Sequence, residues 1–590
     1  MSKRRRKRPR SAAQPEPRAR GARPKPEPPA DPAAPEPPAD TATAPPGGIG
    51  RRALRSPLLL VALAAVLACI PIWLPRYLAS MDGPQHLLAA HMAVHFEQAD
   101  WGFSRYFTAN PSDISPILGD RILRALMLSG LGPPLAQKVL LTVWVVAMAA
   151  AVAYAASWRR RDGATLAVAG LLTVPGLALG MGFFEYLLSL PLAIAALGVV
   201  LRGPGLEWRR LALLAALALG SALAHPFTLV ALLPALGVAA WASRGHASLP
   251  ATRRRGPNPD ARPRRLRRIA PHLGGIALSL LPALGVAGIA FLSHVGAPTP
   301  VTQPTVWAPF GESLRTLALD GFGGLAPTGL LGLAGVGAVL LGGGVGAWRE
   351  GGWASRGLLL AAALYGLLTL ATPSSALNWA LLHHRFVPLA WLVAVVAVGG
   401  SATQSRLGPV ALAVAGLGLL GQSVVSSRVN LQFDRGLREY ASAATFVPRA
   451  SRLLPLNFDP RGESDHRLIR PYLHAWAYVL MERGGMTPYV FATLPSHAFH
   501  FQDRPKAPAE FLDQGYSCER AGLGTGTAAC LDYHRRRLEA YARQAEAFDA
   551  VLTRNAPDEL RPLLEARGFE LRHQSEHLAV YGKATQPDGT

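Results

Sequence analysis

An aspartate and a histidine four positions apart are the first residues whose types and spacing could do chemistry. Asp82 and His86 lie in DGPQHLLAAHMAVHFEQA, whose apolar spacing predicts a helix with Pro84 in its first turn. At about 100° per residue, Asp82, His86 and Glu97 share one face of this helix. The pair could serve as a general base with its orienting partner, or as two ligands of a divalent cation. The structural alternative is an aspartate that caps the helix beside a histidine in interfacial water.

Three further stretches place ionisable residues at the ends of apolar segments. Glu185 lies in GFFEY, His225 precedes a proline in ALAHPF, and His384 and Arg385 lie in HHRF. An ionisable side chain at a membrane helix end is costly unless it lines a cavity, so these residues indicate a functional site. The alternatives are helix caps in water for Glu185 and His225, and a snorkelling interface anchor for Arg385.

Membrane helices are the elements that must position these side chains. The chain has 590 residues, of which 50% are hydrophobic and only 16% charged, with a mean hydropathy of +0.20. Because about a quarter of the residues in soluble proteins are charged, these values indicate an α-helical polytopic membrane protein. We expect about eleven spans, at 57–74, 135–157, 164–180, 183–201, 211–224, 227–241, 269–292, 330–346, 357–371, 385–398 and 407–425. The apolar stretch 211–241 is divided at Pro226, because proline interrupts the helical hydrogen bonds.

The net charge of +23 is concentrated in the N-terminal tail and in the loop at 244–268. This distribution predicts orientation in a membrane, and no nucleic-acid partner is expected. Arg51, Arg52 and Arg55 precede the first span and place the N-terminus in the cytoplasm. Alternation then places every arginine-rich loop on the same side, and loops 75–134 and 293–329 outside.

The composition divides the chain into three predicted domains. Residues 1–50 form a disordered, basic and proline-rich cytoplasmic tail, residues 51–425 the transmembrane domain, and residues 426–590 a small extracytoplasmic α/β or α+β domain. In this last domain we expect strands in the aromatic-rich stretch 474–495, a helix at 534–547 and a closing strand, helix and strand. Cys518 and Cys530 also lie there, and an oxidising exterior permits a disulfide between them, with two unpaired thiols as the alternative.

Four motifs carry a resemblance to a known family. An acid in a long first external loop, together with DGPQHLLAAHMA, FFEYLLSLPLAIAAL, ALAHPF and HHRFVPLAWL, resembles the GT-C superfamily of integral-membrane glycosyltransferases, mannosyltransferase-like and closest to bacterial polytopic members. The resemblance covers about residues 57–425. It implies transfer of a sugar from a polyprenyl-phosphate donor to an acceptor on the extracytoplasmic face of a bacterial inner membrane.

The resemblance also implies roles for the candidate residues. Asp82 corresponds to the first-loop acid of the family, which deprotonates the acceptor or helps to bind a metal, so a divalent cation is a candidate cofactor. Arg385, with His384 beside it, is the candidate for the donor phosphate, since a guanidinium group matches phosphate oxygens. Glu185 and His225 are candidates for the sugar pocket.

The first loop departs from the pattern of the family at one point. Many members carry two acids there, whereas Asp82 is followed by Gly83, so Asp113 or Asp120 would supply the second acid. His91, on the opposite face of the predicted helix, is expected at the surface.

Two other functions remain open: a transporter or flippase of a lipid-linked or anionic solute, and a non-catalytic membrane scaffold. The sequence has no clear internal repeat and its ionisable residues gather at one membrane face, which favours surface chemistry over transport.

Overall fold

The structure is a computed structural model that describes residues 56–110, 118–203, 207–243, 261–296, 305–376, 379–493 and 497–584. The predicted N-terminal tail and Asp113 lie outside these ranges. Within them, eight helices are long and apolar enough to cross a membrane. They correspond to α6 (Pro133–Ala156), α9 (Phe184–Leu201), α11 (Pro226–Ser243), α12 (Ala261–Gly296), α14 (Gly329–Arg349), α15 (Gly352–Ala371), α16 (Val387–Gln404) with the turn before it, and α17 (Gly408–Ala443) with the turn after it.

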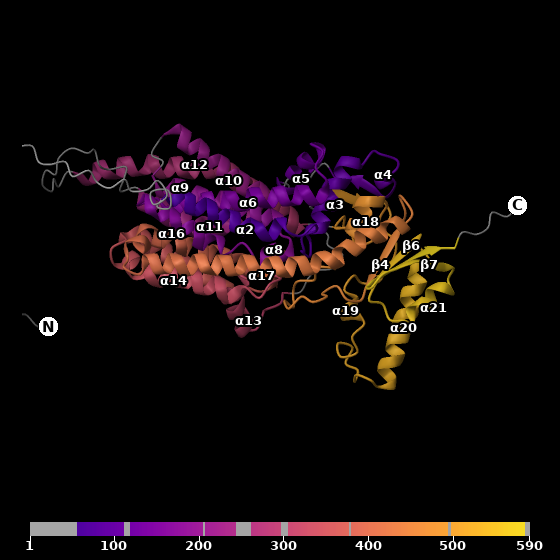
Figure 1. The fold of residues 1–590 in the computed structure, drawn as a ribbon. Helices are drawn as coiled ribbons and strands as arrows, with labels where there is room; N and C mark the ends of the chain where they lie inside the picture. The colour runs from indigo at the N-terminus through magenta and orange to yellow at the C-terminus, as the bar shows by residue number, and fades with distance from the viewer. Residues whose placement is uncertain are drawn as a thin grey trace, which may run out of the picture. The chain divides into compact units, whose positions relative to one another are not determined.

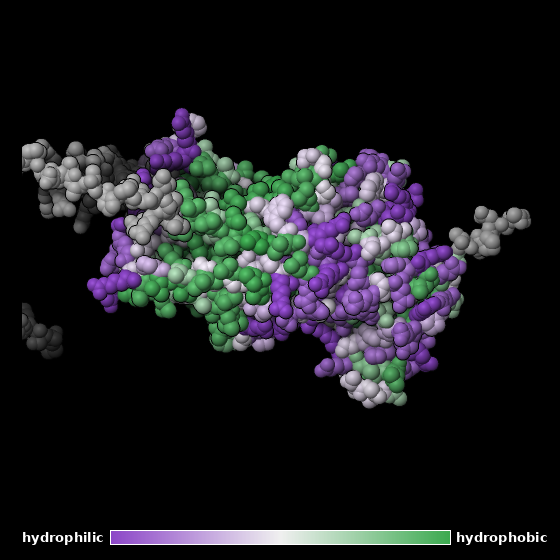
Figure 2. All heavy atoms as spheres, in the orientation of Figure 1, coloured by the Kyte–Doolittle hydropathy of each residue, from purple (hydrophilic) through white to green (hydrophobic). Residues whose placement is uncertain are grey.

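Two apolar helices of 17 residues, α2 (Pro57–Trp73) and α10 (Trp208–Ala224), pack among these eight (Figure 1). On the face shown in Figure 2, hydrophobic residues cover the middle of the helix bundle, whereas hydrophilic residues gather around the C-terminal strands. The chain is therefore a multi-pass helical protein whose lipid-facing and water-facing surfaces are separate.

The third predicted span, at 164–180, is wrong as a continuous helix. Its residues form a 3-10 turn (Arg161–Leu166) and two short helices, α7 (Ala167–Leu171) and α8 (Leu177–Met181). Pro175 lacks an N–H group, so a helical hydrogen bond is lost between α7 and α8. The chain also packs closely there, because a Cβ on Gly176 would lie 2.7 Å from the carbonyl oxygen of Gly321. The predicted count of about eleven spans, which could differ by one or two, is therefore not confirmed in the described ranges.

The predicted break at Pro226 is confirmed, because α10 ends at Ala224 and α11 begins at Pro226. His225 between them adopts an extended backbone, with φ −156° and ψ 109°, and is the only residue separating the two helices. The predicted helix of the first loop is also confirmed as α3 (Gly83–His95). It is followed by α4 (Phe103–Tyr106), β1 (Phe107–Ala109) and α5 (Leu118–Leu128).

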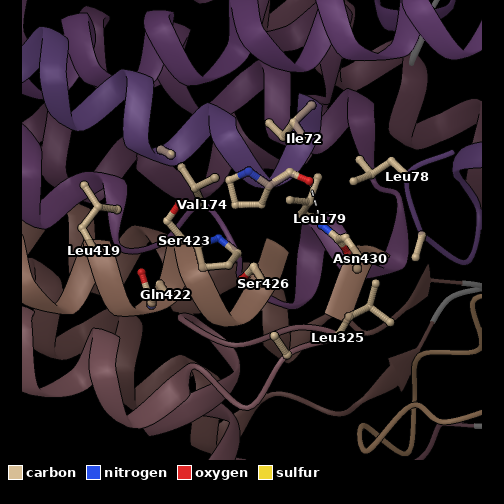
Figure 3. A pocket seen from close by; sticks show the side chains of 16 residues that line it. Ile72, Leu78, Val174, Leu179, Leu325, Leu419, Gln422, Ser423, Ser426 and Asn430 are labelled. Atoms are coloured by element: carbon tan, nitrogen blue, oxygen red, sulfur yellow. Dashed lines mark hydrogen bonds between the residues drawn. The ribbon is translucent and has the colours of Figure 1, made fainter. Parts of the chain in front are cut away.

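Polar side chains of α17 satisfy backbone groups that the helix breaks leave free (Figure 3). Pro71 of α2 cannot donate to the carbonyl of Leu67, and Ser423 Oγ donates to that carbonyl at 2.8 Å instead. Asn430 Nδ2 donates to the carbonyl of Pro71 at 3.0 Å, and Gln422 donates to carbonyls of two neighbouring segments. These residues line a mostly apolar pocket between α2, α17 and the broken segment.

The C-terminal region is built around a four-stranded sheet in the order β4-β6-β8-β7, in which β4 and β6 are parallel and the other pairs antiparallel. Its strands are β4 (Leu453–Asn457), β6 (Ala550–Arg554), β7 (Phe569–Gln574) and β8 (Leu578–Lys583). Its helices include α18 (Ala477–Arg483), α20 (Ala528–Ala545) and α21 (Leu560–Glu565). The predicted α/β character and the helix at 534–547 are confirmed.

Two predictions for this region need correction. The strands expected at 474–495 are wrong, because this stretch contains α18, whose residues from Ala477 to Met481 are all buried and so have no readable periodicity. The closing strand is divided into β7 and β8. Cys518 and Cys530 form a disulfide, which decides between the two alternatives.

A second, two-stranded sheet joins the first loop to the C-terminal region. Strand β1 pairs antiparallel with β5 (Phe499–Phe501), with Thr108 opposite His500. Asn110 extends the pairing, because its backbone N–H donates to the carbonyl of Ala498 at 2.8 Å. Segments almost 400 residues apart in the chain therefore meet beside the end of α3.

Candidate functional site

Four of the six predicted site residues line one cavity of about 240 Å³. It lies where α3, α5, the start of α9, the break between α10 and α11 and the turn before α16 come together. Its lining residues are Gln85, His86, Ala89, Asp120, Phe183, Glu185, Tyr186, His225, Arg385, Phe491 and His497. Among the predicted residues, Asp82 and His384 do not line it.

His86, Asp120 and Glu185 form the acidic side of the cavity. His86 Nδ1 lies 3.1 Å from Asp120 Oδ1. The Glu185 carboxylate accepts the backbone N–H groups of Gly119 at 2.8 Å and Asp120 at 3.1 Å, which lie in the first turn of α5 and have no partner within the helix. Gly119 allows this approach, since a Cβ there would lie 2.9 Å from a Glu185 oxygen.

The charge state of His86 follows from its neighbours. Burial lowers the pKa of His86, but the hydrogen bond and charge of Asp120, with the charges of Glu185 and Asp82, outweigh burial and raise it to about 9. At neutral pH the imidazole is therefore protonated and balances one of the carboxylates.

Arg385 forms the basic side of the cavity. It lies in the 3-10 turn His383–Phe386, and its Nη1 donates to His225 Nε2. The guanidinium group lies 5.3 Å from the ring centres of Phe183 and Trp379 and 5.9 Å from that of Tyr186. Within the part of the chain that the structure describes, no carboxylate lies within ion-pair distance of Arg385, and its Nε is buried without a partner. A partly buried guanidinium without a counter-ion is available to bind an anion.

Asp82 lies outside the cavity wall and contacts a histidine of the C-terminal region. Its Oδ1 lies 3.3 Å from His474 Nε2, and His474 Nδ1 lies 2.9 Å from Glu510 Oε1. Burial lowers the pKa of His474, but Glu510 and Asp82 outweigh it and raise the pKa to about 10. Asp82 occupies the N-cap position of α3, yet its side chain makes no capping bond. The carboxylate predicted as a base is thus held by a buried cation.

His384 points away from the cavity and belongs to a separate cluster. Its Nε2 lies 3.6 Å from Asp320 Oδ2, while Asp320 Oδ1 lies 3.4 Å from His466 Nε2. Thr316 Oγ1 donates to Asp320 Oδ2 at 2.9 Å. Burial raises the pKa of Asp320, but the bonds from His384 and His466 outweigh it and hold the pKa below its usual range. The cluster braces the turn that carries Arg385.

The cavity contains residues that the sequence analysis did not identify. Phe491 and His497 come from the C-terminal region and reach the cavity because β5 pairs with β1. No periodicity or motif marks them, and the only signal is that His497 begins the aromatic stretch HAFHF. His91, expected at the surface, is buried against Trp101 and Phe103 instead.

The acidic side of the cavity has the composition of a metal site. His86, Asp120 and Glu185 each offer one ligand atom, and these atoms lie within 4.8 Å of one another. A set of one imidazole and two carboxylates fits a divalent transition ion in kind, and such an ion would take the place of the proton on His86.

No protein-family model and no curated protein matches the sequence. Among solved structures, the chain is similar to ArnT from Cupriavidus metallidurans bound to undecaprenyl phosphate, with a TM-score of 0.49 and 11% identity, over 90% of this chain and 98% of that chain. It is also similar to the arabinofuranosyltransferase AftD from Mycobacteria, with a TM-score of 0.42 and 14% identity, over 89% of this chain and 40% of that chain. Similarity at this level does not by itself assign an activity.

Proposed function

We propose that this protein is a membrane glycosyltransferase of the GT-C type, which moves a sugar from a lipid-phosphate donor to an acceptor on the extracytoplasmic face. One observation carries the proposal. Arg385, a partly buried guanidinium with no counter-ion among the described residues, and the acid and imidazole groups of His86, Asp120 and Glu185 line the same cavity of a membrane helix bundle. Glycosyl transfer from a phosphate needs both kinds of group.

The surroundings of Arg385 suit a phosphate attached to a lipid. Arg385, Phe183 and Tyr186 line the cavity and also a second, largely apolar pocket that extends between the helices past Leu187 and Leu190. A guanidinium at the border of a polar and an apolar space can bind a phosphate while the hydrocarbon stays among the helices. As the bond to the sugar breaks, negative charge grows on the phosphate, and Arg385 stabilises it with charge-assisted hydrogen bonds.

The acidic side supplies the remaining functions. Protonated His86 adds a second positive charge, while Glu185 and His225 line the space available to the sugar. A divalent cation held by His86, Asp120 and Glu185 would replace the proton on His86 and supply positive charge beside the phosphate in its place. His474 fixes Asp82 at the start of α3 and so acts on the site through the position of that helix.

The full-length protein in liposomes can be tested with undecaprenyl phosphates that carry labelled pentoses or hexoses, with membrane extract as the acceptor source. We expect release of undecaprenyl phosphate together with a labelled product. Asp120→Asn and Glu185→Gln are expected to reduce the rate about 100-fold or more, because proton transfer and charge balance contribute at this scale. Asp162→Asn is a matched control, since Asp162 pairs with Arg160 far from the cavity. Movement of intact donor across the bilayer without release would instead indicate a flippase.

A further inference from the structure

His497 is a cavity residue that the proposed function has not used. It precedes β5, and the pairing of β5 with β1 brings it next to the first loop. Its backbone is fixed as well, because Asn110 Nδ2 donates to the carbonyl of His497 at 3.0 Å. The C-terminal region therefore holds one imidazole at a defined place in a cavity otherwise built mainly by the helices and the first loop.

The ring of His497 is oriented by a backbone contact. Its Nδ1 lies 2.9 Å from the carbonyl oxygen of Phe499, and the backbone N–H of Phe499 points at the same nitrogen at 3.2 Å. Nδ1 therefore accepts the N–H in one tautomer and donates to the carbonyl in the other, and the tautomer that makes the shorter contact has its lone pair on Nε2. Within the described ranges, Nε2 has no protein partner.

The other ionisable groups of the cavity are already engaged. Asp120 contacts His86, Glu185 accepts two backbone N–H groups, and Arg385 donates to His225. The charged groups that influence His497 are Asp120, His86 and His500, and burial keeps the pKa of His497 below its ordinary value. The imidazole is therefore neutral at neutral pH and ready to accept a proton.

We propose that Nε2 of His497 is the base that removes the proton from the hydroxyl group of the acceptor. This inference rests on the proposed function. The hydroxyl oxygen forms a bond to the anomeric carbon of the sugar, the bond from that carbon to the phosphate oxygen breaks, and the phosphate leaves with the electron pair next to Arg385. The proton moves to Nε2, and the resulting imidazolium is stabilised by the carbonyl of Phe499 and the nearby carboxylate of Asp120.

This assignment also divides the cavity between the two substrates. Phe491 and His497 are the part of the cavity wall contributed by the C-terminal region, whereas Arg385 comes from the turn before α16. A ring such as Phe491 offers an apolar face to a sugar ring or an apolar acceptor. The acceptor hydroxyl is thus expected to approach along the C-terminal region, and the donor from among the helices.

The test compares His497→Gln and His497→Ala with His573→Gln, a matched control in β7 of the same region that does not line the cavity. For the His497 variants we expect kcat to fall about 100-fold or more, the KM for the undecaprenyl-phosphate sugar to stay within about threefold, and free imidazole to restore part of the activity of His497→Ala. Binding of undecaprenyl phosphate alone should be unchanged in both variants and in the control.

The pH profile of the wild-type enzyme gives a test that needs no variant. We expect kcat to fall as the pH drops below the ordinary range of histidine, and this acidic limb to disappear in His497→Gln. A wild-type kcat that stays constant down to pH 5, or a His497→Gln variant that keeps more than a tenth of kcat, would overturn the assignment. Absence of sugar release by the wild type from every donor would refute the proposed function instead.

Discussion

Arg385→Gln is the substitution that most directly challenges the phosphate site. In the free protein the guanidinium donates to His225, lies against three aromatic rings and has no carboxylate partner within the described ranges. Charge-assisted hydrogen bonds contribute about 1.5–3 kcal/mol each, and glutamine keeps neither the charge nor the fork. Two such bonds to a phosphate, less the bonds that glutamine can still make, amount to about 3 kcal/mol, which is about 100-fold in Kd.

The assay measures the binding of undecaprenyl phosphate to the detergent-solubilised protein, by thermal shift and by titration. Arg385→Lys keeps the charge without the fork and should fall between the wild type and Arg385→Gln. Arg202→Gln is the control, because Arg202 follows the opposite end of α9 from Glu185 and bonds Ser157 there.

Loss of the aromatic contacts complicates the comparison. Each cation–π contact contributes about 0.5–1 kcal/mol, so the variant should also melt at a lower temperature, and binding must be measured well below that temperature. If folded Arg385→Gln binds undecaprenyl phosphate within threefold of the wild type, the phosphate lies elsewhere and the donor assignment is refuted.

Three further predictions test how the site is positioned. His474 has a pKa raised to about 10, so its stabilising effect is complete below the unfolded value near 6.5 and is lost as the pH rises through about 10. The melting temperature should fall between about pH 6.5 and 10, and this fall should be smaller in His474→Gln. Asp82→Asn leaves His474 with one carboxylate and should destabilise the fold by about 1–3 kcal/mol, while the transfer rate per folded molecule falls less than in Asp120→Asn. Gly182→Ala and Gly130→Ala both place a side chain at a positive φ, +81° and +94°, and each should destabilise the fold by about 1–2 kcal/mol. Only at Gly182 would the added Cβ meet the start of α3, so only Gly182→Ala should also reduce transfer. Equal transfer by the two alanine variants would show that the contact between the turn at Gly182 and the start of α3 does not position the site.

Most helices could be predicted because apolar length is a sufficient signal for a membrane helix. The break at His225 was readable because a proline follows it. The broken segment at 164–180 was not, because its residues are as apolar as those of a continuous helix and only close packing around Gly176 reveals the break. In the C-terminal region, uniform burial removed the periodicity that separates a helix such as α18 from a strand.

The site was predictable where a residue lies at the end of an apolar segment, as Glu185, His225 and Arg385 do. Pairings were not predictable, because they depend on tertiary contacts. Asp82 and His86 share a helix face, yet Asp82 contacts His474, 392 positions later, whereas His86 contacts Asp120. His497 was beyond reach for the same reason, since the register of β1 against β5 decides its place.

The two sides of the cavity depend on different parts of the fold. Arg385 and His225 are held entirely by helices and by the turn before α16. His86 and His497, in contrast, depend on the contact between the first loop and the C-terminal region, through β1 with β5 and through His474 with Asp82. Loosening that contact should therefore disturb proton transfer before it disturbs phosphate binding, because the guanidinium loses none of its supports. Under the proposed function, the helices would thus hold the lipid donor while the C-terminal region controls when the acceptor reacts.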